Sequence, residues 1–286
     1  MRKNIYLILV LVLSLSLTTG CKKEKTVDAM SKTTQNSQSV DEVNKTLSPY
    51  TGEKVSKEVM SNIPVMAIIE NSKDARPQSG LSQADIVYET MAEGGIPRFI
   101  ALFHKNTSSK IGPIRSARSY FIDISKEYNL PFAHCGYSEE ARIMIEKERL
   151  MTMNEFSYGK YYWRDSERKA PHNLYTSSDK LKELASSKGF IKANESPLKF
   201  SKSFWDSEGM LPATTVNLKL NKFYTTNYSF KDGLYYKSMD GTEATDKEGG
   251  KPITVKNIVI QKTTIKLQAD NQHLDINLVG QGDGYV

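Results

Sequence analysis

The chain has 286 residues, of which 38% are hydrophobic and 25% are charged, and its formal net charge is +6 at pH 7. This length and apolar content allow a substantial buried core and predict two domains. No run of Lys and Arg is dense enough to indicate nucleic-acid binding, so we expect no nucleic-acid partner. The two cysteines are far apart and no glycine-rich lysine loop occurs, so we expect no zinc site, no P-loop and no cofactor.

Residues 1–20 have the pattern of a signal peptide. Arg2 and Lys3 precede an apolar run from Ile5 to Leu13, which is too short to span a membrane comfortably. Cys21 follows a Leu-Thr-Thr-Gly sequence that resembles the lipobox of bacterial lipoproteins, with the leucine one place further upstream than that motif prefers. The resemblance implies a lipid on Cys21 that anchors the protein to the membrane outside the cytoplasm. An ordinary secretory signal with an incidental cysteine is the alternative.

Loss of the leader would remove Arg2 and Lys3 and lower the net charge from +6 to +4. A mild excess of Lys suits an anionic membrane or wall surface. Residues 21–46 are polar and too poor in apolar side chains to fold, so they predict a disordered tether. With Cys21 lipidated, Cys135 is the one remaining cysteine, and no internal disulfide is possible. The folded part would therefore depend on its core.

The first folded segment, residues 47–205, is predicted to be an α/β domain that carries several arginine-rich motifs. The apolar run Ile63–Ile69 is typical of a strand buried on both faces. Residues 84–91 and 96–103 flank Glu93-Gly94-Gly95, which favours a β-hairpin. A helix over Leu81–Met91 is the alternative, because apolar residues there also fit helical spacing.

A helix is predicted from Pro113 to about Tyr128, because apolar residues recur there at three- and four-residue intervals. Arg115 and Arg118 would then occupy its first two turns. A helix N-terminus is electrically positive, so two arginines there are unfavourable unless an anion compensates them. That anion could be a bound ligand or carboxylates of the same fold.

Further elements complete a mixed sheet layered with helices. Residues 130–135 predict a strand that ends at Gly136, and Ser138 can cap a helix that runs to about Leu150. Ser178 is expected to cap a later helix that ends at Gly189. After Pro212 the sequence changes to short alternating runs, at residues 216–220, 228–236, 255–266 and 274–279, which predict a small, mostly antiparallel β domain over residues 214–286.

The last residues predict an incomplete hairpin. Leu274–Val279 alternates as a strand does, and a glycine-rich turn precedes Tyr285-Val286, which resembles the start of a return strand. We therefore expect a truncated β domain in which the strand at residues 274–279, or a neighbour, is left as an unpaired apolar edge.

One set of motifs runs through the chain: Glu70-Asn71, residues 75–81, 84–89 and 93–95, Arg98-Phe99, residues 112–118 and Ala170-Pro171-His172-Asn173-Leu174. Together these motifs resemble the YerB-like family of predicted lipoproteins from Gram-positive bacteria. The resemblance covers roughly Leu47 to the end, and it implies a lipid-anchored extracytoplasmic protein with a two-domain body and no established activity. Lys237 departs from the pattern, in which we expect arginine.

Arginines dominate these motifs and predict a binding site for an anion. Convergent guanidinium groups can hold a carboxylate or a phosphate in bidentate fashion. An internal network of arginines and carboxylates that only stabilises the fold is an equally weighted alternative. The candidate ligand-binding residues are Arg76, Arg98, Arg115, Arg118, Asn71 and Asn173, and the carboxylates near them in sequence are Asp85, Glu89 and Glu93.

His134, His172 and Glu89 are candidates for catalysis, since an imidazole that titrates near neutral pH can act as an acid or base with a carboxylate. A histidine in a loop more often satisfies backbone groups. His134 to Ser138 faintly resembles a nucleophile elbow but lacks its second glycine.

Three classes of function remain open: a module that binds an anionic ligand of the cell envelope, a hydrolase that uses His134 or His172 with a carboxylate, and a scaffold for protein partners. The arginines favour binding.

Overall fold

The computed structural model describes residues 45–190, 196–201, 211–278 and 283–286. The predicted leader, the predicted lipidation site at Cys21 and most of the predicted tether lie outside the described residues. Lys45 and Thr46, predicted to end the tether, belong to strand β1 (Lys45–Leu47), which pairs with β2 (Lys54–Ser56). Within the described ranges, no helix is both long and apolar enough to cross a bilayer.

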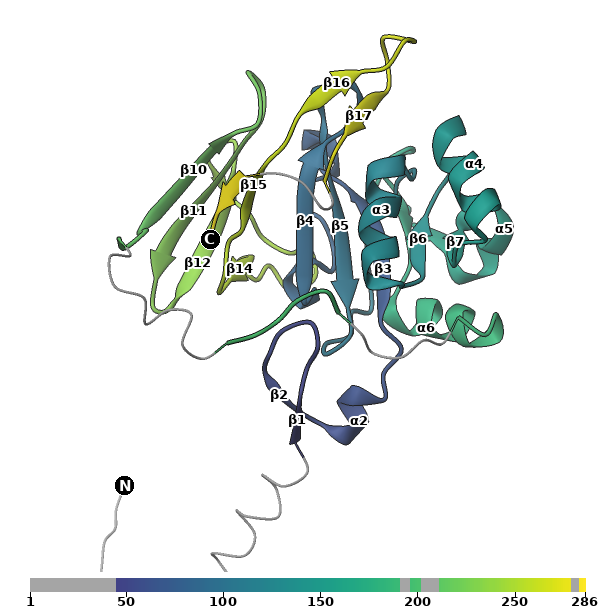
Figure 1. The fold of residues 1–286 in the computed structure, drawn as a ribbon, viewed down its shortest axis with the longest axis horizontal. Helices are drawn as coiled ribbons and strands as arrows, with labels where there is room; N and C mark the ends of the chain where they lie inside the picture. Colours follow the sequence, from purple (N-terminus) through teal and green to yellow (C-terminus); the bar gives the residue numbers. More distant parts are fainter. Residues whose placement is uncertain (1–44, 191–195, 202–210, 279–282) are drawn as a thin grey trace, which may run out of the picture. The chain divides into compact units, whose positions relative to one another are not determined.

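Five strands form the central sheet in the order β4-β5-β3-β6-β7 (Figure 1). Strand β3 runs antiparallel to β5 and parallel to β6, and β6 runs parallel to β7. The predicted hairpin is confirmed, because β4 pairs with β5 and the helix alternative survives only as one short 3-10 turn at Leu81–Gln83. The strands are β3 (Val65–Glu70), β4 (Ile86–Met91), β5 (Pro97–Phe103), β6 (Phe132–His134) and β7 (Thr152–Asn154).

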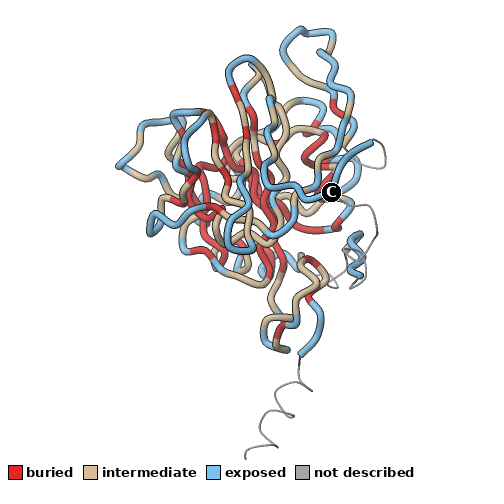
Figure 2. Tube along the Cα trace, turned by 90° about the vertical axis from the view of Figure 1, so that its left-hand side faces the viewer, coloured by how far each residue is buried: buried red, intermediate tan, exposed pale blue. Residues whose placement is uncertain are grey.

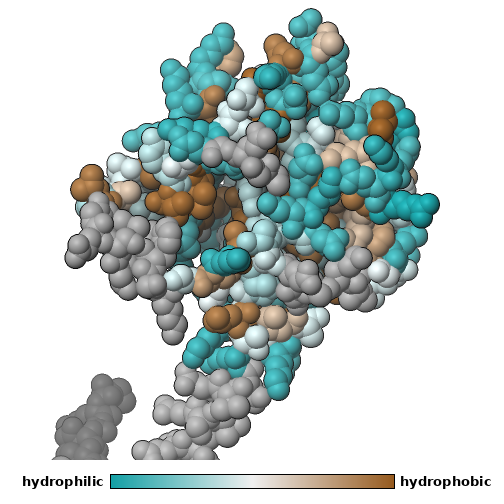
Figure 3. Space-filling view, in the orientation of Figure 1, coloured by the Kyte–Doolittle hydropathy of each residue, from teal (hydrophilic) through white to brown (hydrophobic). Residues whose placement is uncertain are grey.

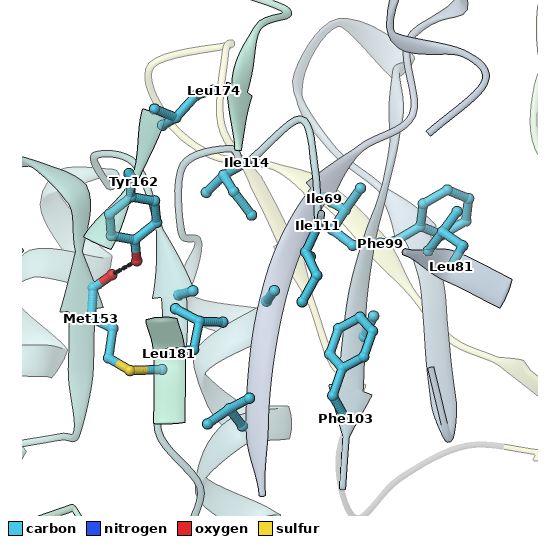
Figure 4. Close-up of a cluster of buried hydrophobic side chains, with 14 of the residues drawn as sticks. Ile69, Leu81, Phe99, Phe103, Ile111, Ile114, Met153, Tyr162, Leu174 and Leu181 are labelled. Atoms are coloured by element: carbon cyan, nitrogen blue, oxygen red, sulfur yellow. Dashed lines mark hydrogen bonds between the residues drawn. The ribbon is translucent and has the colours of Figure 1, made fainter. Parts of the chain in front are cut away.

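Strand β3 is buried along its whole length and separates two hydrophobic clusters, as expected for a strand covered on both faces. Val65, Ala67 and Ile69 join one cluster, which contains Leu181 and Leu184 of helix α6 (Figure 4). Met66 and Ile68 join the other, which contains side chains of α3 and α4. Helices therefore cover both faces of the sheet, and the buried trace runs through its centre (Figure 2).

The helix at Ser138 is confirmed as α4 (Glu139–Glu148), with the Ser138 hydroxyl accepting a hydrogen bond from the Ala141 N–H. The later helix is also present, but Ser177 rather than Ser178 caps it. The other helical elements are α2 (Lys57–Met60), α3 (Ser119–Tyr128), α5 (Glu155–Tyr158) and α6 (Ser178–Ser187), with 3-10 turns at Lys73–Ala75, Leu81–Gln83, Glu93–Gly95 and Gly159–Tyr161.

The predicted start of the central helix at Pro113 is wrong, because α3 begins at Ser119. The preceding segment is extended, and its backbone groups bond to neighbouring strands: the Arg115 N–H donates to the Ile68 carbonyl, and the Ala117 N–H to the Gly136 carbonyl. Amides used in this way are not available for helical hydrogen bonds. Arg115 therefore lies outside the helix, and Arg118 occupies its N-cap position.

The second half is sheet-rich and antiparallel, as predicted. Strands β11 and β12 are joined by a turn at Asp232 and Gly233, both of which have positive φ. The main sheet contains β10 (Thr215–Lys219), β11 (Thr225–Lys231), β12 (Leu234–Met239), β13 (Thr242–Glu243) and β14 (Thr254–Val255).

Short strand pairs complete the second half. Of the residues predicted to form a strand at 274–279, Leu274–Ile276 form β17, which pairs with β16 (Ile265–Leu267) in a two-stranded sheet. Tyr285 lies in β18 (Asp283–Tyr285), which pairs with β15 (Ile260–Lys262). The predicted single run over residues 255–266 is thus divided among β14, β15 and β16.

The two halves share their cores. Met239, Ala244 and Ile253 of the second half belong to the cluster that contains α6, and Ile276 belongs to the cluster that contains α3. Residues 44–286 accordingly form one compact unit. The face seen in Figure 3 is mainly hydrophilic, with hydrophobic side chains in separate small groups.

Candidate functional site

Three parallel strands end at the same edge of the central sheet. Glu70 is the last residue of β3, Cys135 and Gly136 follow β6, and Glu155 and Phe156 follow β7. In open α/β sheets, ligands bind in the crevice outside the carboxyl ends of the strands. This edge is therefore where the fold would place a site.

A pocket of about 270 Å³ lies at this edge. Residues of the extended segment before α3 form one wall, and residues that follow β6 and β7 form another. The hairpin of β8 (Trp163–Arg164) and β9 (Leu174–Tyr175), with its polar loop, closes a third side. The lining is half charged or polar, from Arg115, Ser116, Cys135 and Arg164, and half apolar, with Tyr137, Phe156 and Pro171 prominent.

Glu70 organises the charged side of the pocket, although its side chain is only 4% exposed. Its Oε1 accepts hydrogen bonds from Arg115 Nη2 at 2.9 Å and from Ser72 Oγ at 2.7 Å. Nδ1 of His172, from the loop between β8 and β9, lies 2.9 Å from the same oxygen. Oε2 of Glu70 is buried without a hydrogen-bond partner in the described structure. One carboxylate thus fixes both a guanidinium and an imidazole.

Arg115 and Arg164 are the two guanidinium groups of the pocket lining. Arg115 donates one hydrogen bond to Glu70 and has a 29% exposed side chain. Arg164 donates to Oδ1 of Asn173 at 3.0 Å, and no carboxylate of the described residues lies within ion-pair distance of it. A guanidinium has five N–H donors. Both groups therefore keep donors for an anion, and Asn173 orients Arg164.

Arg76, Asn71 and Glu89 meet in a second cluster, at the junction of the two halves. Asn71 donates to Glu89 at 2.7 Å and accepts from Arg76 Nε at 2.9 Å. Arg76 also pairs with Asp240 at 2.7 Å, and Glu89 accepts from Lys237 at 2.6 Å. These groups satisfy one another, which supports a structural role for this cluster.

Arg98 and Arg118 meet in a third cluster around Glu93. Arg118 Nε donates to Glu93 at 2.6 Å, and Arg98 Nη2 lies 3.7 Å from its other oxygen. Burial lowers the pKa of Arg98 to about 10, so it remains charged at neutral pH. The two guanidinium groups also donate to the carbonyls of Ser116 and Ala117, at 2.8 and 2.7 Å. They hold the pocket wall in its extended conformation.

His134 is not part of the pocket lining. It is fully buried, with Nδ1 2.8 Å from the Gly136 carbonyl and Nε2 2.6 Å from the Thr152 hydroxyl. Burial lowers its pKa to about 4. A neutral imidazole with both nitrogens engaged joins two strand ends and cannot exchange protons with a ligand.

Cys135 lines the pocket as a protonated thiol. Burial, followed by the charge of Glu155, raises its pKa to about 11, and the positive charges of Arg164 and Arg115 offset only part of this. A thiolate is the reactive form of cysteine. Cys135 is therefore a poor nucleophile at neutral pH. The described residues also contain no cluster of side chains able to hold a metal ion.

Sequence reasoning missed Glu70, Arg164 and Phe156 as site residues. Glu70 carried a usable signal, because a charged residue at the end of a fully apolar strand needs a partner when it is buried. Arg164 and Phe156 carried none, since the edge they share forms only when β6, β7 and β8 assemble.

Comparisons of the sequence and of the structure with known proteins agree on one family. Residues 50–191 match "Protein of unknown function (DUF3048) N-terminal domain", and residues 214–286 match the corresponding C-terminal domain. The chain is 37% identical over 253 residues to the protein named "Putative lipoprotein YerB" of Bacillus subtilis (strain 168), covering 86% of this chain and 76% of that protein. The crystal structure of YerB from Bacillus subtilis matches with a TM-score of 0.71 and 35% identity over 80% of this chain and 79% of that one.

Protonation of His134 should destabilise the fold in acid. Its pKa is about 4 when folded and about 6.5 when unfolded, so between these pH values the unfolded chain binds a proton that the folded chain does not. Stability should therefore fall as pH decreases from 6.5 to 4, by about 3 kcal/mol from this group. Urea unfolding at several pH values would measure it. His134→Gln should flatten the slope; an unchanged slope in this variant would contradict the assignment.

Proposed function

Since this chain belongs to the DUF3048 family and is similar to YerB of Bacillus subtilis over 86% of its length, we propose that it is a lipid-anchored extracytoplasmic protein that binds an anionic ligand of the cell envelope. The proposed binding site is the pocket outside the carboxyl ends of β3, β6 and β7. The family description gives no function, so the proposal rests on the leader sequence and on the charges of this pocket.

The observation that best supports the binding function is that the guanidinium of Arg164 has no carboxylate partner among the described residues. It lines the pocket, yet no carboxylate among the described residues compensates it. Arg115 lines the same pocket and shares its partner Glu70 with His172. An unpaired guanidinium beside a partly used one forms a site for a carboxylate or phosphate. Of the arginines in the sequence motifs, Arg115 contacts the ligand in this proposal, whereas Arg76, Arg98 and Arg118 support the framework.

The lipid anchor rests on the leader and on the printed name of the Bacillus subtilis relative. An acyl chain alone binds membranes only weakly, so two chains on Cys21 would be needed for stable anchoring. The polar residues 22–44 would then separate the folded unit from the membrane surface.

Anion binding should depend on Arg115 and Arg164. We expect Arg115→Gln and Arg164→Gln each to weaken the binding of phosphate-bearing envelope fragments by about tenfold or more, because a charge-assisted hydrogen bond is lost. Arg164→Gln should leave the melting temperature of the free protein nearly unchanged, since Arg164 bonds only Asn173 among the described residues. Ligand-induced shifts in melting temperature would measure binding.

Arg142→Gln is the matched control for this experiment. Arg142 is on α4 and pairs with Glu139 and Glu146 of its own helix, so its loss should not affect binding. Equal loss of binding in all three variants would indicate non-specific charge attraction, and unchanged binding in Arg115→Gln and Arg164→Gln would refute this site.

Lipidation should require Cys21. Metabolic labelling with a fatty-acid analogue should mark the wild-type chain and not Cys21→Ala, because the thiol is the acceptor of the lipid. The Cys135→Ala variant is the control, and it should label as the wild type does. Labelling of Cys21→Ala at the wild-type level would remove the anchor from the proposal.

The contact between His172 and Glu70 favours a second function, hydrolysis of the bound ligand. The imidazole is held by the carboxylate through Nδ1, and in the described structure no protein group bonds Nε2. Nε2 could then take a proton from an attacking water, with Glu70 orienting the ring. Cys135 is protonated at neutral pH, so water is the nucleophile in this proposal.

Hydrolysis would be detected as consumption of a bound envelope fragment, followed by mass spectrometry. We expect His172→Gln to abolish turnover while the fragment still binds through Arg115 and Arg164. His273→Gln, altered in an exposed turn, should behave as the wild type. Binding without any turnover by the wild type would leave the binding function alone.

A further inference from the structure

We propose that the ligand carries its acid group directly on a ring with an apolar face, and that Phe156 selects this ring. The inference rests on the binding function proposed above and adds the chemical class of the ligand. It depends on the apolar half of the pocket, which the arginines do not explain.

Phe156 is unusually placed for a large apolar side chain. It lines the pocket, but it is 74% exposed. Its backbone is fixed, because Oδ1 of Asn154 accepts hydrogen bonds from both the Phe156 N–H and the Gly136 N–H, at 3.3 and 3.1 Å. One side chain thus sets the position of the aromatic rim relative to the loop after β6. An exposed aromatic ring on a fixed backbone, in the same lining as two guanidinium groups, is suited to contact with a ligand.

Gly136 opens a slot next to this ring. A Cβ at this position would lie 3.4 Å from Phe156 Cε2 and 3.6 Å from Ser116 Oγ. A methyl group would therefore fill the space between the aromatic ring and the opposite wall. Gly136 also has a φ of +71°, a conformation that glycine adopts readily. The slot is thus bounded by the Phe156 ring on one side and by Ser116 on the other.

Tyr137 extends the apolar wall. It is 40% exposed, and its ring packs against that of His134 at 6.0 Å between centroids. His134 is buried and locked by two hydrogen bonds, so it gives Tyr137 a rigid support. The pocket therefore has two aromatic groups on the side of Gly136 and two guanidinium groups, Arg115 and Arg164, in the same lining.

The size of the pocket limits the ligand. Its volume of about 270 Å³ is slightly below the usual lower range for small-molecule sites, roughly 300 Å³. It can hold one six-membered ring with its acid group, or the terminal unit of a longer chain. A free inorganic anion would use the guanidinium groups but not the aromatic wall. The apolar face of either a sugar ring or an aryl ring could pack on Phe156.

The test compares ligands that share an acid group and differ in the ring. Isothermal titration would use inorganic phosphate, glycerol 3-phosphate, glucose 1-phosphate and phenyl phosphate. We expect both ring compounds to bind about tenfold more tightly than glycerol 3-phosphate, because one aromatic packing contact raises affinity by about this factor. Preference for glucose 1-phosphate or for phenyl phosphate would show whether a sugar or an aryl group is the source of the ring.

Variants assign the effect to Phe156. Phe156→Ser should reduce the advantage of the ring compounds to about the level of glycerol 3-phosphate, without changing the affinity for inorganic phosphate. Phe156→Tyr should retain the advantage. Phe223→Ser is the matched control, because Phe223 is 59% exposed in the second half of the chain.

The outcomes separate this inference from the function on which it rests. If all four phosphates bind equally and Arg164→Gln weakens them, the anion site stands and ring selection is wrong. If the ring advantage persists in Phe156→Ser, Phe156 is not the selecting residue. If none of the phosphates or the corresponding carboxylate, glucuronate, binds the wild type, the anion site and the ring selection are both overturned.

Discussion

Hydrogen bonds of Glu89 and Arg76 join the two halves of the molecule, because Thr226 and Lys237 donate to Glu89 and Arg76 donates to Asp240. Asn71 is buried at the end of β3, where it joins Glu89, Arg76 and Gln78. Glu89 in turn receives the ammonium of Lys237, which is 4% exposed. A buried lysine without its carboxylate partner destabilises the fold, because its ammonium group has lost its hydration and no opposite charge compensates it. Loss of the contact between the halves would therefore leave Lys237 and Glu89 without each other.

Most of the arginine charge is balanced by this framework. Asp240 forms an ion pair with Arg76, Glu93 with Arg98 and Arg118, and Glu70 with Arg115. The internal network considered from the sequence thus describes part of these motifs. Arg164 differs, because its described partner is the neutral amide of Asn173. A positive charge left over at the rim of a pocket attracts anions, whereas balanced pairs in the interior do not.

Local hydrophobic patterns correctly predicted the buried strands, but they gave a wrong result where backbone hydrogen bonds to distant strands determine the conformation. Strand β3 and its hairpin neighbours were correct, because continuous apolar runs and a Gly-Gly turn reflect local physics. The helix start at Pro113 was wrong. Ile114 and Ala117 fit helical spacing, yet they are buried in different clusters, on opposite faces of the sheet, because the segment is extended and bonds to strands far away in sequence. Periodicity cannot distinguish these two causes of apolar spacing.

The sequence by itself determined the family and the mixed α/β sheet followed by an antiparallel β region. These follow from residue types and near-neighbour spacing, which act over a few positions. Only the tertiary structure decided which charges meet. Glu70 lies 102 residues from His172 in sequence and 45 from Arg115, but the three are joined at one oxygen. Such contacts arise from how strands pair and which of their ends coincide, and no local pattern records that.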